Sequence, residues 1–174
     1  FEGRLPQGVS VFVVNTDTRH LEAKAAYNRV METALRGIDG GIDLIYKKTD
    51  STLRGNIGAE LAAVLDAVLK SRAGLKGVRE VSLPEGSANA GSSDGPLLFF
   101  APAMPDMGRV TKDGKQYVSE VPLHKTEFAF DPLNPIRTSD VRTIIAEQTE
   151  IRVLSLGPDA LQSALAEGQS THLF

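Results

Sequence analysis

The segment Ile42–Leu69, IDLIYKKTDSTLRGNIGAELAAVLDAVL, decides the fold of this chain. It begins with an apolar run, residues 42–47, that is typical of a buried β-strand. It ends with apolar residues at helical spacing, which predict a helix with one apolar face: Ile57, Leu61, Val64, Leu65, Val68 and Leu69. The connection between them, KKTDSTLRGN, is dense in charged and hydroxyl groups. The segment is therefore a strand-to-helix unit whose connection carries chemistry.

Similar units occur along the rest of the chain. Apolar runs at residues 9–15, 97–103 and 151–156 predict further strands. The first is typical of a strand buried on both faces, and the second is also expected to be buried. Helical spacing over 21–35 predicts a helix, and Ser139 is a candidate N-cap for another over 141–148. A short extended excursion is expected at 114–123, a last helix at 158–166, and a flexible loop at 71–95, where Gly, Ser and Pro gather. This order predicts an α/β, Rossmann-like three-layer domain with a mainly parallel sheet.

Length and composition bound the class of protein. A chain of 174 residues suits one domain, and its net charge of −3 gives no reason to expect nucleic acid or an anionic membrane as a partner. No apolar run approaches the roughly 18 residues of a membrane span, and there is no cysteine for a disulfide. The chain opens with Phe1 and closes without a clear helix end, so we expect a piece of a longer protein, incomplete at both ends.

Three polar clusters follow three of the predicted strands. They are NTDTRH at 15–20, KKTDSTLRGN at 47–56 and PAMPDMGR at 102–109. In parallel sheets, ligands bind outside the carboxyl ends of the strands. We therefore expect the three clusters to converge on one binding site.

The second cluster can bind a hydroxylated anion. The first amides of the following helix offer an anion seat, Ser51 and Thr52 add hydroxyl donors, and Arg54 adds a planar fork that suits a carboxylate. Gly55 would let a ligand approach the backbone, and Asp50 would accept hydrogen bonds from sugar hydroxyls. The alternative remains open that Ser51 or Thr52 caps the helix, that Asp50 pairs with a lysine, and that Arg54 is solvated.

The other two clusters have the same ambiguity. Asp17 and Arg19 again place a carboxylate beside a guanidinium, although Asp17 or Thr18 would also serve as a helix cap. Gly108 and Arg109 bring a second guanidinium to the same edge, or form an ordinary turn. The three histidines are too scattered to predict a zinc site, and neither a P-loop nor a dinucleotide-binding fingerprint is present.

Longer stretches carry a family resemblance. In order, NTDTRHL, YKKTDSTLRGNIGAEL, APAMPDMGR, YVSEVPLHKTEFAFDPLNPI and EQTEIRV resemble the N-terminal sugar-binding domain of the four-carbon acid sugar kinases. The likeness runs from about residue 9 to residue 153. Two features depart from the family's pattern: the 71–95 loop is long, and MPDMGRV replaces a more usual Phe-Pro-Ala-x-Gly-Arg-Thr.

The resemblance implies a two-domain, cytoplasmic, ATP-dependent kinase that phosphorylates the terminal hydroxyl of threonate, erythronate or an oxo-tetronate. ATP and Mg²⁺ would be bound mainly by a C-terminal domain absent from this chain, which is the expected partner, and a homodimer is left open. Asp50 is the candidate catalytic residue, and no metal ligand is assigned. The substrate-binding residues carried over are Asp17, Arg19, Lys48, Asp50, Ser51, Thr52, Arg54, Gly55, Asn56, Gly108 and Arg109.

The sequence-based hypothesis for the site is that Arg54 and the helix N-terminus hold the substrate carboxylate, while Asp50 and Asp17 hold hydroxyls. A rival reading is a non-catalytic module that binds small carboxylates, or an effector-type interaction domain. An isomerase or epimerase would need a metal cluster or a paired acid and base, and the sequence shows neither.

Overall fold

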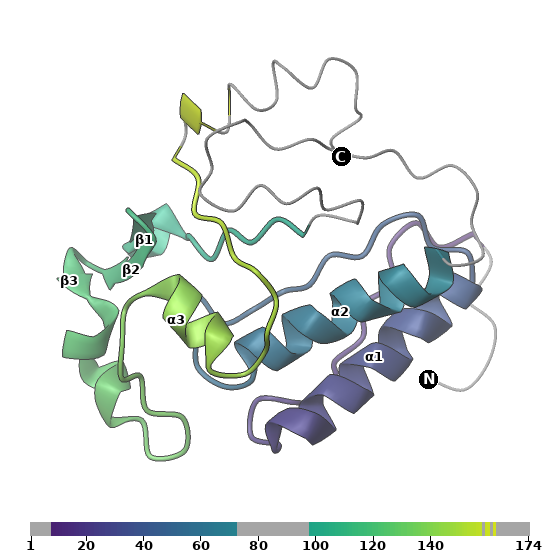
Figure 1. Ribbon diagram of the computed structural model, residues 1–174, viewed down its shortest axis with the longest axis horizontal. Helices are drawn as coiled ribbons and strands as arrows, with labels where there is room; N and C mark the ends of the chain where they lie inside the picture. Colours follow the sequence, from purple (N-terminus) through teal and green to yellow (C-terminus); the bar gives the residue numbers. More distant parts are fainter. Residues whose placement is uncertain (1–7, 73–97, 158, 161, 163–174) are drawn as a thin grey trace.

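The computed structural model describes residues 8–72, 98–157, 159, 160 and 162. This part of the chain contains two long helices, α1 (Ala23–Asp39) and α2 (Ile57–Arg72), and a short helix, α3 (Val141–Ala146). Its sheet has the strands β1 (Arg109–Lys112), β2 (Lys115–Val118) and β3 (Val121–Pro122). Figure 1 shows α1 beside α2, with α3 and the sheet near the N-terminal end of α2.

The two long helices confirm the helical periodicity of the sequence. They pack through small and branched side chains, with Val30, Met31 and Ala34 of α1 against Ala63, Val64 and Ala67 of α2. The predicted apolar stripe of α2 is only partly right, because Leu69 is exposed whereas the alanines between the stripe positions are buried. The reason is that other parts of the chain pack against α2 on more than one side. A single apolar stripe therefore underestimates the surface that the helix buries.

A second core lies where α2 meets α3. It contains Leu53, Ile57, Leu61, Leu123, Ile136, Val141, Ile144 and Ile145. The predicted N-cap of α3 is wrong by one residue: Asp140 Oδ1 accepts from the Thr143 amide at 2.8 Å. Ser139 Oγ accepts instead from the His124 amide at 3.0 Å, and α3 ends at Ala146, before Gln148.

Two strands of the small sheet, β2 and β3, lie within the short extended excursion predicted at 114–123, whereas β1 precedes it. The strands pair in the order β1-β2-β3, all antiparallel, with Arg109 opposite Val118 and Lys112 opposite Lys115. Asp113 and Gly114 both have positive φ, 51° and 74°, which is the geometry of a tight two-residue hairpin turn.

The predicted mainly parallel sheet is not confirmed: within the described residues, the sheet is antiparallel, and residues 9–15, 42–47, 98–103 and 151–156 form no strand ladder. Residues 9–14 are exposed rather than buried on both faces, with Val11 at 76% and Val13 at 86%. An apolar run indicates that a segment packs against other parts of the protein. It does not specify which segment pairs with its backbone through hydrogen bonds.

Two of these segments still pack as extended chain on the helical core. Burial alternates along 98–101 and again along 151–154, and Leu98, Phe100, Ile151 and Val153 contact the core around α3. In Figure 1, residues 42–50 run along α2 and lead directly into the loop before it. The described chain is thus an α/β arrangement in which extended segments deliver two polar loops to the start of α2. Of the predicted loop at 71–95, residues 71 and 72 complete α2 and the rest lies outside the described residues, as does most of the helix predicted at 158–166.

Candidate functional site

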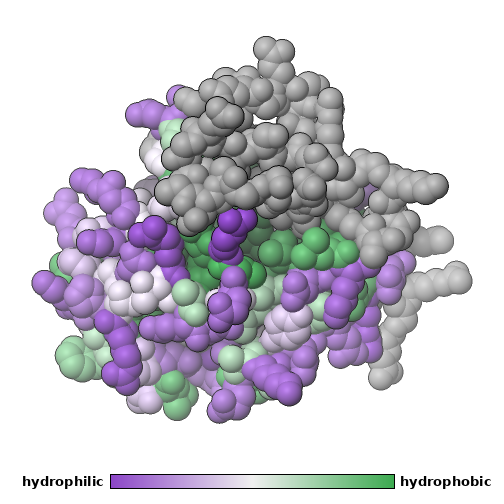
Figure 2. All heavy atoms as spheres, in the orientation of Figure 1, coloured by the Kyte–Doolittle hydropathy of each residue, from purple (hydrophilic) through white to green (hydrophobic). Residues whose placement is uncertain are grey.

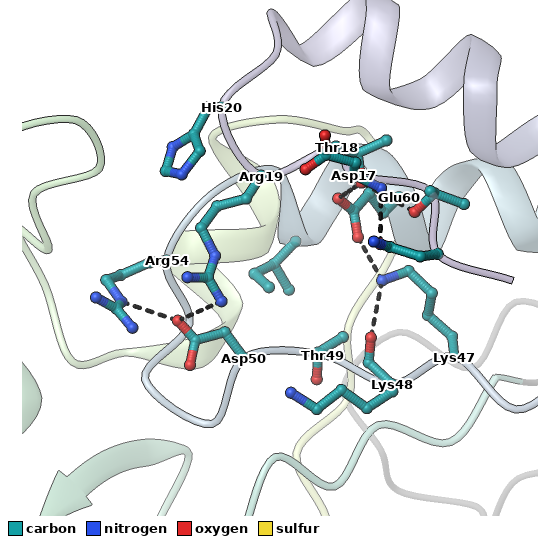
Figure 3. Close-up of a pocket in the computed structure, with 13 residues that line it drawn as sticks. Asp17, Thr18, Arg19, His20, Lys47, Lys48, Thr49, Asp50, Arg54 and Glu60 are labelled. Atoms are coloured by element: carbon teal, nitrogen blue, oxygen red, sulfur yellow. Dashed lines mark hydrogen bonds and ion pairs between the residues drawn. The ribbon is translucent and has the colours of Figure 1, made fainter. Parts of the chain in front are cut away.

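Two of the three polar clusters line one cleft. The cleft has a volume of about 270 Å³ and lies between residues 15–20 and 47–50, with the first turn of α2 at its base. Figure 3 shows Arg19, Asp50 and Arg54 on one side of it and Lys47 with Glu60 on the other. Of the predicted site residues, the lining includes Asp17, Arg19, Lys48, Asp50 and Arg54.

Asp50 is the acceptor around which one side of the cleft is organised. Its Oδ2 accepts from Arg54 Nε at 2.8 Å and from Thr52 Oγ1 at 2.9 Å, while Oδ1 accepts from the Thr52 amide at 3.2 Å. Burial would raise the pKa of Asp50, but the hydrogen bonds from Thr52 and Arg54 outweigh it and the pKa is lowered. Asp50 is therefore a carboxylate at neutral pH. Thr52 is itself buried, so it affects the cleft through its hydrogen bonds to Asp50.

Arg54 is held from three directions. Besides Asp50, it donates from Nη1 to Asp131 Oδ2 at 3.0 Å, and its guanidinium carbon lies 5.0 Å from the centre of the Phe128 ring. Burial would lower the pKa of Arg54, yet the hydrogen bonds to Asp50 and Asp131 raise it. The guanidinium therefore ties the loop before α2 to the segment around Asp131, 77 residues away in the sequence.

The opposite side of the cleft is built on Glu60, in the first turn of α2. Its buried carboxylate forms an ion pair with Lys47 Nζ and accepts from Thr18 Oγ1 at 2.5 Å. Asn56 Nδ2 donates to the carbonyl oxygens of Thr18 and Leu21, at 2.8 and 2.7 Å. These contacts fix residues 18–21 and Lys47 against the same helix end.

The predicted anion seat at the start of α2 is wrong for two of its amides. The amides of Gly58 and Ala59 donate to Gln148 Oε1 at 2.8 and 3.3 Å, so a side chain of this protein already occupies the helix N-terminus. Gly55 does permit a close approach, but of the chain itself. It has φ 88°, and a Cβ there would lie 3.0 Å from the carbonyl oxygen of Arg19 and 2.9 Å from its Cγ.

The third cluster is not part of the cleft lining. Gly108 ends a 3₁₀ turn with φ 67°, and Arg109 begins β1 with Nη1 donating to the Met107 carbonyl at 2.5 Å. The hairpin contacts the site's loop through a residue that the sequence did not single out. Gln116, fully buried, donates from Nε2 to the carbonyl oxygens of Ser51 and Pro102, at 2.8 and 3.2 Å.

Sequence reasoning missed several residues that shape the cleft. Glu60 could have been noticed in the sequence, because it is the one charged residue in the run from Ile57 to Leu65. Asp131 and Gln148 gave no such signal, since each acts on residues 77 or more positions away. His20 lines the cleft and is hydrogen bonded to Asn134 at 2.9 Å, which adds a second link to the segment that holds Arg54.

Among the described residues, no group of three or more His, Asp or Glu side chains converges in a way that could hold a metal ion. No helix in this part of the chain is both long and apolar enough to cross a bilayer.

Among known proteins, the chain is similar to kinases that are named for four-carbon acid sugars. The chain is 37% identical to D-threonate kinase of Salmonella typhimurium over 82% of this chain and 28% of that protein. It is 32% identical to D-erythronate kinase of Heliobacterium modesticaldum over 80% of this chain and 26% of that protein. A crystal structure of a domain of unknown function from Bordetella bronchiseptica, described as a domain-swapped dimer with bound citrate, matches with a TM-score of 0.56 at 29% identity, over 76% of this chain and 28% of that one.

The chain spans little more than a quarter of the length of these relatives. The family described as the sugar-binding N-terminal domain matches residues 2–172. The kinase relatives and the family description agree with the resemblance carried by the motifs around the cleft. This chain therefore belongs to the family of sugar-binding N-terminal domains found in four-carbon acid sugar kinases.

Proposed function

We propose that this chain is the acid-sugar-binding half of an ATP-dependent kinase, which phosphorylates the terminal hydroxyl of a four-carbon acid sugar of the threonate or erythronate type. One observation supports this most strongly. A single cleft of about 270 Å³ is lined by the carboxylates Asp17 and Asp50 together with the cations Arg19 and Lys48. A hydroxylated carboxylate needs both kinds of group, because its hydroxyls donate and its carboxylate accepts.

The magnitudes suit a metabolite. A hydrogen bond to a charged group contributes about 1.5–3 kcal/mol. Two or three such bonds in one cleft reach the roughly −4 to −8 kcal/mol of a ligand that binds at millimolar to micromolar concentration. The cleft is also largely pre-formed by the contacts of Glu60 and Asn56, so little of that energy is lost in ordering its loops.

Asp50 is the proposed catalytic residue. Its lowered pKa keeps it ionised, and it would orient a substrate hydroxyl by accepting its hydrogen bond. Asp17 has a positive φ of 46° and presents a second carboxylate from the facing loop. Phosphoryl transfer depends mainly on positioning and charge stabilisation, so acceptors that fix the hydroxyl are what this half of the enzyme has to supply.

ATP and Mg²⁺ are proposed to bind mainly to the C-terminal domain of the full-length protein. The described residues do not fit the nucleotide group, because they hold no cluster of carboxylates for a metal ion and the sequence holds no phosphate-binding loop. We derive no step through ATP from this chain. Its own residues bind the acid sugar and orient the hydroxyl that reacts.

The relatives support the substrate class and suggest an assembly. Those named above act on D-threonate and D-erythronate by name, and the Bordetella domain holds citrate, another hydroxylated carboxylate. We further propose a homodimer, because that relative is a domain-swapped dimer and apolar side chains of this chain's extended segments are exposed. We also propose that the protein is cytoplasmic, as the family resemblance implies.

A ligand panel tests the function in the full-length protein. Thermal unfolding is measured with D-threonate, L-threonate, D-erythronate and longer aldonates, each with and without ATP. At least one tetronate should raise the unfolding temperature, and the same tetronate should support ADP formation. No effect of any tetronate would refute the substrate class, whereas stabilisation without ADP formation would favour a non-catalytic carboxylate-binding module.

A further inference from the structure

The cations that line the cleft differ in how far their charge is already satisfied. Lys47 is committed to the wall of the cleft, because its ammonium is paired with Glu60 and also donates to the Lys48 carbonyl at 3.2 Å. Arg54 is equally committed. Its Nε and Nη1 donate to Asp50 and Asp131 at 2.8 and 3.0 Å, and its side chain is only 23% exposed.

Asp131 is itself built to receive Arg54. Its Oδ1 accepts from the amides of Leu133 and Asn134 at 3.1 and 2.7 Å, which leaves Oδ2 directed at the guanidinium. These backbone hydrogen bonds, more than the charge of Arg54, lower the pKa of Asp131. A ligand carboxylate that bound Arg54 would therefore compete with two ionised, pre-positioned carboxylates.

Arg19 and Lys48 have spare capacity. The Arg19 side chain is 43% exposed, and its Nη2 lies 3.5 Å from Asp50 Oδ2, which already accepts from Arg54 and Thr52. That separation is beyond a normal hydrogen bond, so the guanidinium keeps donors for another acceptor. Lys48 is exposed, and its ammonium has no ion pair or hydrogen bond among the residues that the structure describes.

The two side chains reach the cleft from different loops. Figure 3 shows Arg19 descending toward Asp50 from the loop at 15–20, and Lys48 lying below Asp50 on the loop at 47–50. A ligand between them would meet cations from both loops with Asp50 beside it. This is the arrangement needed to hold a carboxylate next to a hydroxyl-bearing carbon.

We propose that Arg19 and Lys48 bind the carboxylate of the acid sugar, and that Arg54 is a positioning residue that fixes Asp50 and the Asp131 segment. The assignment rests on the proposed function and departs from the sequence-based hypothesis, in which Arg54 holds the carboxylate. It makes Arg19 the residue that distinguishes an acid sugar from a neutral polyol.

The test compares an acid with its neutral counterpart in the full-length protein. Dissociation constants are measured by calorimetry for D-threonate and for D-threitol, which carries a hydroxymethyl group in place of the carboxylate. Arg19→Ala should weaken D-threonate binding about 10- to 100-fold and leave D-threitol binding unchanged. Lys48→Ala should act in the same direction by about 2- to 5-fold, because an exposed ammonium contributes less.

Arg54 variants should behave differently. Arg54→Ala and the milder Arg54→Lys should weaken both ligands by similar factors, because they misplace Asp50 rather than remove a carboxylate contact. The ratio of the two dissociation constants should then stay at the wild-type value. Because partial unfolding would also weaken both ligands equally, the folded fraction of each variant is checked by thermal unfolding. Arg142→Ala, an exposed arginine on α3 with its side chain 60% exposed, is the matched control and should change neither constant.

Two outcomes would overturn the assignment and can be told apart. If wild-type protein binds tetronates but Arg54→Lys loses the preference for acid while Arg19→Ala keeps it, only the roles of the arginines are wrong. If folded wild-type protein binds no tetronate, the proposed function falls as well.

Discussion

At the scale of single residues, the cleft depends on ionised side chains that satisfy one another before any ligand arrives. Asp50 accepts three hydrogen bonds, and Arg54 donates to two carboxylates while lying over the Phe128 ring. Removing one member of such a network leaves the others partly buried and unpaired, which costs more than the lost bond itself. Asp50 is the member whose removal is simplest to interpret, because its charge can be titrated.

Asp50→Asn should lower stability at pH 7 by about 1–3 kcal/mol, because Arg54 loses its nearest carboxylate. The pKa of Asp50 is lowered in the folded state, so its contribution is fully present above the unfolded value of about 4 and is lost as pH falls through the folded value. Thermal unfolding of variant and wild type should therefore differ most at neutral pH and converge as the pH falls through the lowered pKa of Asp50. Asp106→Asn, at an exposed position, should show no such dependence; a gap that stays constant with pH would contradict the assignment.

The spacing of residues in the sequence could predict only the contacts made within one loop of this network. Asp50, Thr52 and Arg54 lie close together in the sequence, so their association follows from one loop. The alternative that Asp50 pairs with a lysine is wrong, since it pairs with Arg54 and Lys47 pairs with Glu60. The partner of Asp131 could not be predicted, because no neighbouring residue in the sequence indicates that it accepts a hydrogen bond from the distant Arg54.

At the scale of elements, the start of α2 is the point on which the site is assembled. Gln148, just beyond α3, accepts from the amides of Gly58 and Ala59 and donates from Nε2 to the Gly55 carbonyl at 2.9 Å. Gly58 also lets α2 lie close against α3, as a Cβ there would lie 2.4 Å from the Ile145 carbonyl oxygen. One side chain therefore caps the helix and holds the loop that precedes it.

Gln148→Ala should destabilise the start of α2, because two helix amides and the Gly55 carbonyl lose their partner at about 1–3 kcal/mol for each group left buried. Hydrogen–deuterium exchange of the peptide around 55–62 should become faster, and the unfolding temperature should fall. Gln148→Glu keeps the acceptor and should retain most of the protection, since a carboxylate suits a helix N-terminus. Unchanged exchange in Gln148→Ala would show that the amides find another acceptor.

The elements themselves were predictable to different degrees. Helical periodicity gave α1 and α2, since amphipathic spacing is a property of the segment alone. Only a short extended excursion at 114–123 was predicted around the hairpin, and the pairing of β1 with β2 was not. The parallel sheet could not be read in the same way, because a ladder is a property of two segments and the apolar runs at 9–15 and 42–47 do not name their partners.

At the scale of the whole molecule, the described residues leave large apolar side chains exposed to solvent. Val11, Val13, Leu44, Tyr46 and Phe99 are all more than 60% exposed. Figure 2 shows apolar atoms gathered in a band across the middle of one face, over the region where extended chain lies beside α2. Surfaces of this kind are usually interaction sites in folded proteins.

Light scattering of the full-length protein should accordingly give the mass of a dimer. Replacing Val11 and Val13 together by lysine should shift the mass toward the monomer, because charge at a buried interface is costly. The conservative exchange of both residues to isoleucine is the control and should leave the dimer intact. A monomeric wild type whose lysine variant unfolds would show instead that another part of the same polypeptide covers these residues.

The contact between Gly55 and Arg19 has a consequence for how such an enzyme could work. The two loops that flank the cleft touch through their backbones, and both are anchored to α2 by Asn56 and Glu60. Neither loop can swing away without breaking its anchor, so neither of these two described loops is free to close over the cleft as a flap. For the proposed kinase, we therefore expect a rigid-body hinge that brings the nucleotide toward this fixed cleft and shields the reaction from water.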